Sequence, residues 1–225
     1  MSRYILVVLA LVVFTGCDNG IEAAKTAVEA QLVHKQMVEY SDLEQYPGKV
    51  VCGRINAAGA WGEGAGYKPF VVIDGQAETD PSADDLAIFC SQDSAAALLT
   101  TLGIGPMDQS NPNLLLVQKH LNELHGALQR YLADNTTYPS TKAGLQSLLA
   151  ANAAKQKADA QAYIETIPVD PWGRPYHYKH KRQLHGTVKK YNLYTLGKDG
   201  VEGGQGDNAD ISNLHLKYLN HIADL

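Results

Sequence analysis

The chain has 225 residues, of which 45% are hydrophobic and 19% are charged. This composition is typical of a globular protein, and the length allows one large core or two small ones, of which we expect two. The formal net charge of -5 argues against sequence-independent binding to nucleic acid, because such binding needs a positive surface against the phosphates.

Residues 1–16 predict a signal peptide. Arg3 precedes an apolar run over residues 4–14, which is too short to span a membrane and fits a secretory signal. The tetrapeptide Phe-Thr-Gly-Cys that ends at Cys17 resembles a bacterial lipobox, although an aliphatic residue is usual at its first position. That resemblance implies lipid on Cys17 and a periplasmic, membrane-anchored protein, with Asp18 favouring the inner membrane. The alternatives are an ordinary signal peptide or an uncleaved anchor, with Cys17 incidental.

The three cysteines, at positions 17, 52 and 90, predict one disulfide. If Cys17 carries lipid, Cys52 and Cys90 are left to pair in an oxidising compartment. A bridge between them would stabilise the fold by about 3–4 kcal/mol in the chain-entropy model. The alternative is a pair of buried free thiols.

Residues 17–105 predict a small α+β domain that contains this disulfide. Its first helix is marked by apolar residues at helical spacing, namely Ile21, Ala24, Val28 and Leu32. Residues 50–56 and 68–73 have the apolar, β-branched character of strands. We therefore expect a helix that packs on a hairpin.

The segment Gly59–Gly66 between these two strands carries an alternative function. Its glycines suit a mobile loop, and Trp61 would either contact a ligand there or cover the core. The segment lacks the Gly-Lys-Ser/Thr ending of a phosphate-binding loop and opens no helix, which argues against nucleotide binding. The alternative hypothesis is a small periplasmic ligand-binding protein or enzyme that uses this loop.

Glycines and prolines over residues 103–112 predict a linker at residues 106–112, and residues 113–225 predict a second domain. This domain opens with Asn111 as N-cap and Pro112 in the first helical turn. A leucine-rich stripe at a period of 3.6 residues then predicts a long amphipathic helix that ends near Asp134.

A glycine-rich loop over residues 196–211 places several carboxylates close together in sequence. Calcium prefers carboxylate and carbonyl oxygens, and glycines allow a short loop to wrap around an ion. The EF-hand spacing is absent, so the loop predicts a calcium site of another type. A solvated turn is the alternative.

Three motifs resemble the periplasmic domain of the major pseudopilin of type II secretion systems. They cover residues 131–145, 163–178 and 191–211, and the second contains Asp-Pro-Trp-Gly-x-Pro-Tyr. The resemblance spans residues 112–213 and implies an α+β fold in which a long helix packs on a small antiparallel sheet with a calcium loop.

The resemblance also implies the calcium ligands. They are the side chains of Asp199, Asp207 and Asp210 and the carbonyl groups of Leu196 and Val201. The assignment stays open among Asp207, Asn208 and Asp210. An ion would turn the mutual repulsion of the carboxylates into attraction, so calcium would stabilise the loop and would not be a catalyst.

The chain departs from the pseudopilin pattern at its amino-terminal end. Pseudopilins begin with a hydrophobic helix that forms the filament core, whereas a domain precedes the helix of residues 113–134 in this chain. We therefore predict a non-enzymatic, lipid-anchored protein with a structural or docking role in protein secretion or envelope assembly, with type II secretion components as candidate partners.

Histidine spacing argues against a zinc enzyme. His120 and His125 are five positions apart, whereas the two ligands of a His-Glu-x-x-His helix are four apart and share a face. His177 and His180 fall in a predicted strand and differ by an odd number, so they point to opposite faces. The sequence thus predicts no catalytic residues.

Overall fold

The structure is a computed structural model that describes residues 18–32, 38–57, 66–108, 110–149, 162–181 and 190–225. The chain divides into two compact units, Met1–Leu86 and Ala87–Leu225. Mixed helices and antiparallel sheets confirm the predicted α+β class.

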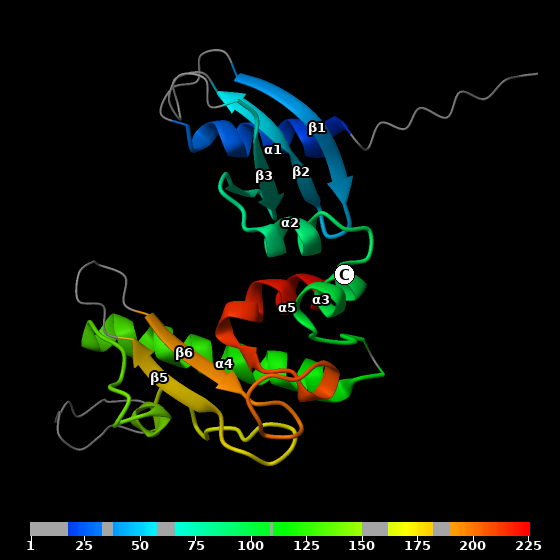
Figure 1. Cartoon of the computed structure of the whole chain (residues 1–225). Helices are drawn as coiled ribbons and strands as arrows, with labels where there is room; N and C mark the ends of the chain where they lie inside the picture. Colours follow the sequence, from blue (N-terminus) through cyan, green and yellow to red (C-terminus); the bar gives the residue numbers. More distant parts are fainter. Residues whose placement is uncertain (1–17, 33–37, 58–65, 109, 150–161, 182–189) are drawn as a thin grey trace, which may run out of the picture. The chain divides into compact units, whose positions relative to one another are not determined.

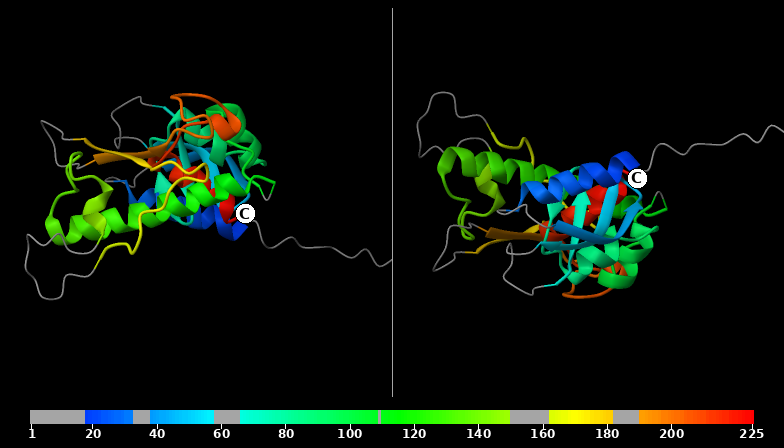
Figure 2. Two further views of the ribbon diagram at one scale, coloured as in Figure 1. Left: turned by 90° about the horizontal axis from the view of Figure 1, so that it is seen from below. Right: turned by 90° about the horizontal axis from the view of Figure 1, so that it is seen from above.

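The first unit is a four-stranded antiparallel sheet covered by one helix. Helix α1 (Asp18–Ala30) lies across a face of the sheet, as the views in Figures 1 and 2 show. The strands follow the order β1-β2-β3-β4. Their bounds are β1 Val38–Tyr46, β2 Val50–Ala57, β3 Lys68–Ile73 and β4 Gln76–Glu78.

The predicted helix and both predicted strands of this unit are confirmed. Val28 of α1, Ile55 of β2 and Phe70 of β3 are fully buried in its core. Strand β1 was not predicted, because it is largely polar and breaks its alternation at an irregularity between Ser41 and Glu44. The periodicity of the sequence therefore predicts the inner strands β2 and β3 and not the outer strand β1.

The second unit is built around one long helix and a small sheet. Helix α4 (Pro112–Asn135) lies along one face of an antiparallel sheet with the order β5-β6-β7 (Figure 1). The strands are β5 His177–Lys181, β6 Lys190–Thr195 and β7 Ile211–Ser212. The shorter helices are α3 Ser94–Leu102, η1 Leu145–Leu148, η2 Gly206–Asn208, η3 Asn213–His215 and α5 Leu216–Ala223.

The amphipathic pattern of α4 is confirmed from Leu114 to Leu128, whereas Leu132 near its end is only partly buried. The carboxamide oxygen of Asn111 accepts a hydrogen bond from the backbone N–H of Leu114 at 3.3 Å, and Pro112 lies in the first turn. The buried face consists of Leu114, Val117, Leu121, Leu124, Ala127 and Leu128. Packing of this face, with the cap, fixes where the helix begins and how it meets the sheet.

The structure differs from the predicted linker at residues 106–112. The boundary between the units falls at Leu86–Ala87, inside α2 (Ala83–Phe89). Ile104 and Met107 are only 1% and 4% exposed, so this segment is part of the second unit. Gly103, just before this segment, is the left-handed cap that ends α3, and Pro112 at its end lies in the first turn of α4.

Candidate functional site

The acidic loop of residues 196–211 connects β6 to β7 and folds tightly on itself. Gly197 has a φ of +64°, and a Cβ atom there would lie 2.5 Å from the carbonyl carbon of Asn208. The backbone N–H of Lys198 donates to the carbonyl of Asp207 at 2.7 Å. A side chain at position 197 would therefore separate the two arms of the loop.

Each of the three predicted carboxylate ligands has its own protein partner. Asp199 accepts from the N–H of Val201 at 3.1 Å, and one oxygen of Asp210 accepts from the N–H of Gly203 at 2.9 Å. Asp207 accepts from the side-chain amide of Asn111 at 3.0 Å, and its second oxygen lies 4.0 Å from the Lys198 ammonium group. The loop uses these acids to hold its own turns and to meet the start of α4.

The predicted ligands are oxygen atoms of the kind that calcium prefers, but they are not gathered around one point. Within the described ranges, no three Asp, Glu, His or Cys side chains gather as a metal would require. Leu196 and Val201 lie in the same loop, and Oδ1 of Asp210 is buried without a hydrogen-bond partner. That oxygen is a free acceptor for a cation, whereas Asp199 and Asp207 would have to turn from their present partners.

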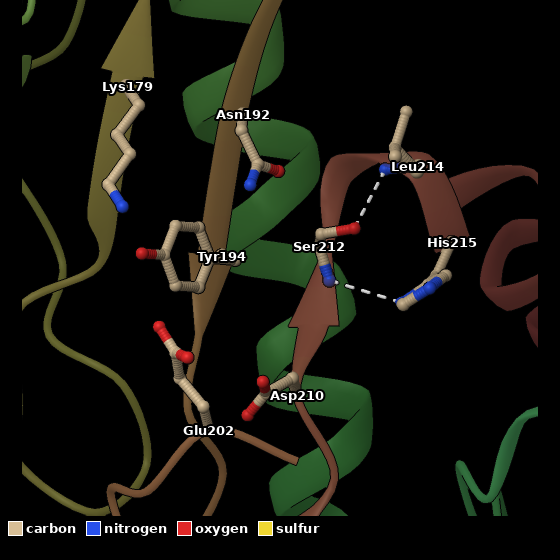
Figure 3. A pocket seen from close by; sticks show the side chains of 8 residues that line it. All are labelled: Lys179, Asn192, Tyr194, Glu202, Asp210, Ser212, Leu214 and His215. Atoms are coloured by element: carbon tan, nitrogen blue, oxygen red, sulfur yellow. Dashed lines mark hydrogen bonds between the residues drawn. The ribbon is translucent and has the colours of Figure 1, made fainter.

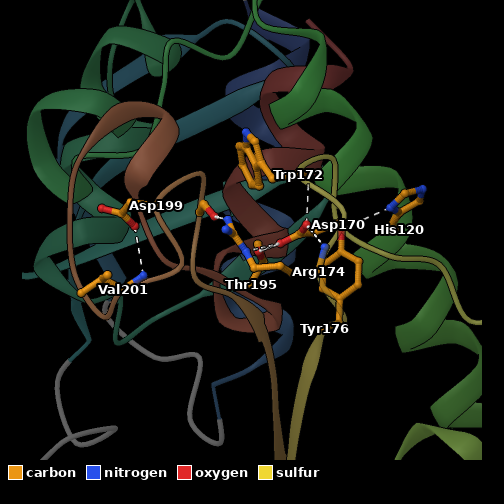
Figure 4. Close-up of polar contacts among 9 residues, drawn as sticks. His120, Asp170, Trp172, Arg174, Tyr176, Thr195, Asp199 and Val201 are labelled. Carbon is orange, nitrogen blue, oxygen red and sulfur yellow. Dashed lines mark hydrogen bonds and ion pairs between the residues drawn. The ribbon is translucent and has the colours of Figure 1, made fainter.

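A second carboxylate, Asp170, organises the turn before β5 and is only 3% exposed. Figure 4 shows how its oxygens face the surrounding donors. Oδ1 accepts from the N–H groups of Trp172 at 3.1 Å and Arg174 at 2.8 Å, and Oδ2 accepts from the Thr195 hydroxyl at 2.7 Å. One buried acid thus fixes the turn and ties it to the end of β6.

Arg174 links this turn to the acidic loop. Its guanidinium donates to the carbonyl oxygen of Gly197 and lies against Gly200, while its Nε is 3.7 Å from Asp170 (Figure 4). This role of Arg174 could not be read from the sequence. The only indication was a basic residue inside the Asp-Pro-Trp-Gly-x-Pro-Tyr motif.

The histidines of α4 serve packing. Nδ1 of His120 lies 3.2 Å from the Tyr176 hydroxyl, and Nδ1 of His125 lies 2.5 Å from the Tyr191 hydroxyl. Burial lowers the pKa of both histidines below their ordinary value. The two rings therefore contact different tyrosines, on different parts of the sheet and turn.

The strand histidines are also separated, as predicted. His177 stacks on Tyr194 with ring centroids 4.9 Å apart, and the ring of His180 lies 6.4 Å from that of Tyr138.

A pocket of about 340 Å³ lies beside the acidic loop. Figure 3 shows it on the sheet face that points away from α4. Its lining residues are Lys179, Asn192, Tyr194, Glu202, Asp210, Ser212, Leu214 and His215. The pocket is not visible in the sequence, because its residues come from three strands, the acidic loop and η3.

The predicted covalent features can be followed only in part. Cys52 and Cys90 are both disulfide-bonded, as the cysteine count predicts. Cys17 and residues 58–65 with Trp61, most of the alternative ligand loop, lie outside the described ranges. In the part of the chain that the structure describes, no helix has the length and apolar character needed to cross a membrane.

Comparison with known proteins matches residues 107–214 to the type II secretion system protein G family. Core protein G of Pseudomonas aeruginosa type II secretion is 36% identical over 121 residues, which cover 52% of this chain and 81% of that relative. The Vibrio cholerae core protein G is 38% identical over 96 residues, which cover 42% of this chain and 63% of the relative.

A solved structure is also similar, namely the major pseudopilin from the type 2 secretion system of enterohaemorrhagic Escherichia coli. It shares 28% sequence identity and a TM-score of 0.35, over 47% of this chain and 89% of that one.

Proposed function

The chain belongs to the type II secretion system protein G family, and from this premise we propose that it is a non-enzymatic structural or docking component of protein secretion. The observation that carries the proposal is the 36% identity over 81% of a core protein G. The matched region runs from the start of α4 through the acidic loop to η3. The proposed role therefore belongs to the second unit.

The use of polar side chains in this unit supports a structural role. Asp170 is enclosed by turn and strand donors, and His120 and His125 each meet a tyrosine hydroxyl. Groups used in this way hold the helix, the turn and the sheet together, and they are not directed at an open cleft.

We further propose that calcium stabilises the acidic loop. Three carboxylates and the carbonyl groups of Leu196 and Val201 are hard oxygen donors of the kind that calcium prefers. The buried, unpartnered Oδ1 of Asp210 supports the proposal. Asp199 and Asp207 would join it by exchanging a backbone N–H and a side-chain amide for the ion, which would couple ion binding to loop structure.

The proposed anchor is lipid on Cys17, which would hold the protein at the periplasmic side of the membrane. The lipobox-like sequence before Cys17 supports this proposal, and Asp18 favours the inner membrane. The first unit would then lie between the anchor and the secretion-related unit in sequence.

Two segments that flank the family match extend the second unit. Residues before position 107 include Phe89 and Ser94, which meet α5 beyond position 214. The ring of Phe89 lies 5.2 Å from that of Tyr218, and the Ser94 hydroxyl lies 3.4 Å from Nε2 of His221.

Deletion of the gene in its native host tests the proposed role. We expect less of the proteins exported by type II secretion in the medium, restored by the wild-type chain. Cys17→Ser should lose incorporation of labelled fatty acid and fail to restore export fully. Normal export after deletion, together with no cross-link to any secretion component, would argue against the proposal.

A further inference from the structure

The pocket beside the acidic loop combines hydrogen-bond acceptors that the protein itself leaves unused. Oδ1 of Asn192 and Oδ1 of Asp210 are both buried and have no hydrogen-bond partner. Both residues line the same pocket (Figure 3). Because buried polar atoms are almost always paired in folded proteins, two unpaired acceptors in one pocket indicate a missing donor.

The charge of the pocket favours a cationic guest. Two carboxylates, those of Glu202 and Asp210, line it against one ammonium group, that of Lys179. The formal charges of these three groups sum to one negative charge. A guest with one positive charge would neutralise it.

The pocket also has an aromatic wall, the ring of Tyr194. The ring of Tyr194 lines the pocket, and His177 stacks on it at 4.9 Å. The Lys179 ammonium group already lies 5.9 Å from the ring centroid. A cation near this ring gains from the negative charge of the ring face, so Tyr194 suits a flat, positively charged group.

From these contacts we propose that the pocket binds an arginine side chain of a partner protein. A guanidinium group is planar and carries several N–H donors, so one group can face the carboxylates of Glu202 and Asp210 and lie against Tyr194. The inference rests on the proposed docking role and names a surface for it. It shares the Asp210 carboxylate with the calcium proposal, so calcium and the arginine side chain would compete for that group.

The rim of the pocket supports a protein as the source of this arginine. Leu214, which lines the pocket, is 64% exposed. A large exposed apolar side chain beside a charged pocket would contact the residues that flank an arginine in a partner chain. A volume of about 340 Å³ is sufficient for one such side chain.

The probe is the peptide acetyl-Ala-Arg-Ala-amide, added to the full ¹⁵N-labelled chain in detergent with chelator present, so that no calcium competes for Asp210. The control peptide replaces arginine with citrulline, which has nearly the same shape and no charge. We expect saturable shifts of the backbone amides of Asn192, Tyr194 and Ser212 with a Kd of about 1 mM. Citrulline should bind at least about tenfold more weakly, and added salt should weaken the arginine peptide.

Two variants of the lining sharpen this test. Glu202→Gln should weaken binding about three- to tenfold, whereas Lys179→Met should strengthen it severalfold because it removes a competing positive charge. Unchanged shifts elsewhere in each spectrum would show that the variant is folded. Equal binding of both peptides, shifts outside the pocket, or variants without effect would overturn the proposal.

The result is separable from the docking role. If the purified chain binds the arginine peptide but export is normal after deletion of the gene, the pocket is supported and the docking role is rejected. Cross-links to secretion components without arginine binding would keep the role and reject the pocket.

Discussion

Replacement of Asp170 tests how the second unit is held together. Its carboxylate accepts hydrogen bonds from two backbone N–H groups and from the Thr195 hydroxyl, and it is 3% exposed. Asp170→Ala would leave these donors without acceptors inside the fold. Because Arg174 also loses its nearby carboxylate, the link to the acidic loop should loosen.

The magnitude follows from the number and burial of these contacts. Hydrogen bonds to a charged group contribute roughly 1.5–3 kcal/mol each, and breaking a buried ionic arrangement costs roughly 3–5 kcal/mol. We therefore expect Asp170→Ala to lower the free energy of unfolding by about 4 kcal/mol. With an m-value of about 2 kcal/mol/M, the urea midpoint should fall by about 2 M.

The assay uses the fluorescence of Trp172, which lies in the same turn. The chain has two tryptophans, so a Trp61→Phe background leaves Trp172 to report on the second unit. Asp170→Asn is the matched control: its amide oxygen can keep both backbone donors and its NH₂ can donate to Thr195, so we expect a loss of about 1–2 kcal/mol. Equal losses for the two variants, or a loss below about 1 kcal/mol for alanine, would refute this reasoning.

Two further predictions concern the acidic loop and the partly buried His125. Gly173→Ala and Gly197→Ala both place a side chain at positive φ, but only the new side chain at position 197 would meet backbone atoms within 4 Å. In the same urea assay, Gly173→Ala should lower the free energy of unfolding by about 1–2 kcal/mol, and Gly197→Ala should lower it clearly more. Similar losses for the two variants would argue against the tight loop. Burial lowers the pKa of His125 below its ordinary value of 6.5, so its contribution to stability is present above that pH and is lost as the pH falls through the lowered value. Unfolding midpoints at several pH values should show a smaller acid loss in His125→Gln, and parallel curves for the two proteins would contradict the assignment.

Helix α4 of the second unit could be predicted from the sequence because its apolar pattern coincides with its most buried residues. Val117, Leu121 and Leu124 follow the helical period and are fully buried in α4. Asn111 is both a typical N-cap by sequence and the actual one. Local pattern and tertiary packing therefore agree along this helix.

The missed elements are those in which local pattern is weak. Helix α3 is nine residues long with a buried face of only Ser94 and Leu98, although its cap by Asp93 was a usable indication. Strand β7 has two residues, too few for any alternation. Their positions depend on packing against segments far away in sequence, which periodicity does not contain.

The candidate site shows the same division. Its glycines and acids mark the loop of residues 196–211 in the sequence. The sequence did not show that Arg174 binds the carbonyl of Gly197, or that Asp207 faces Asn111 at the start of α4. These contacts join residues 23 and 96 positions apart, so only the folded chain brings them together.

Thermal unfolding of the full chain, with calcium and with chelator, tests the central proposal most directly. At calcium concentrations about 100-fold above Kd, binding should add about 2.7 kcal/mol of stability, which raises Tm by roughly 5–10 °C. Asp199→Ala should abolish this rise, whereas alanine at the exposed Asp224 should keep it. An equal Tm with calcium and with chelator in the wild-type chain would contradict the account.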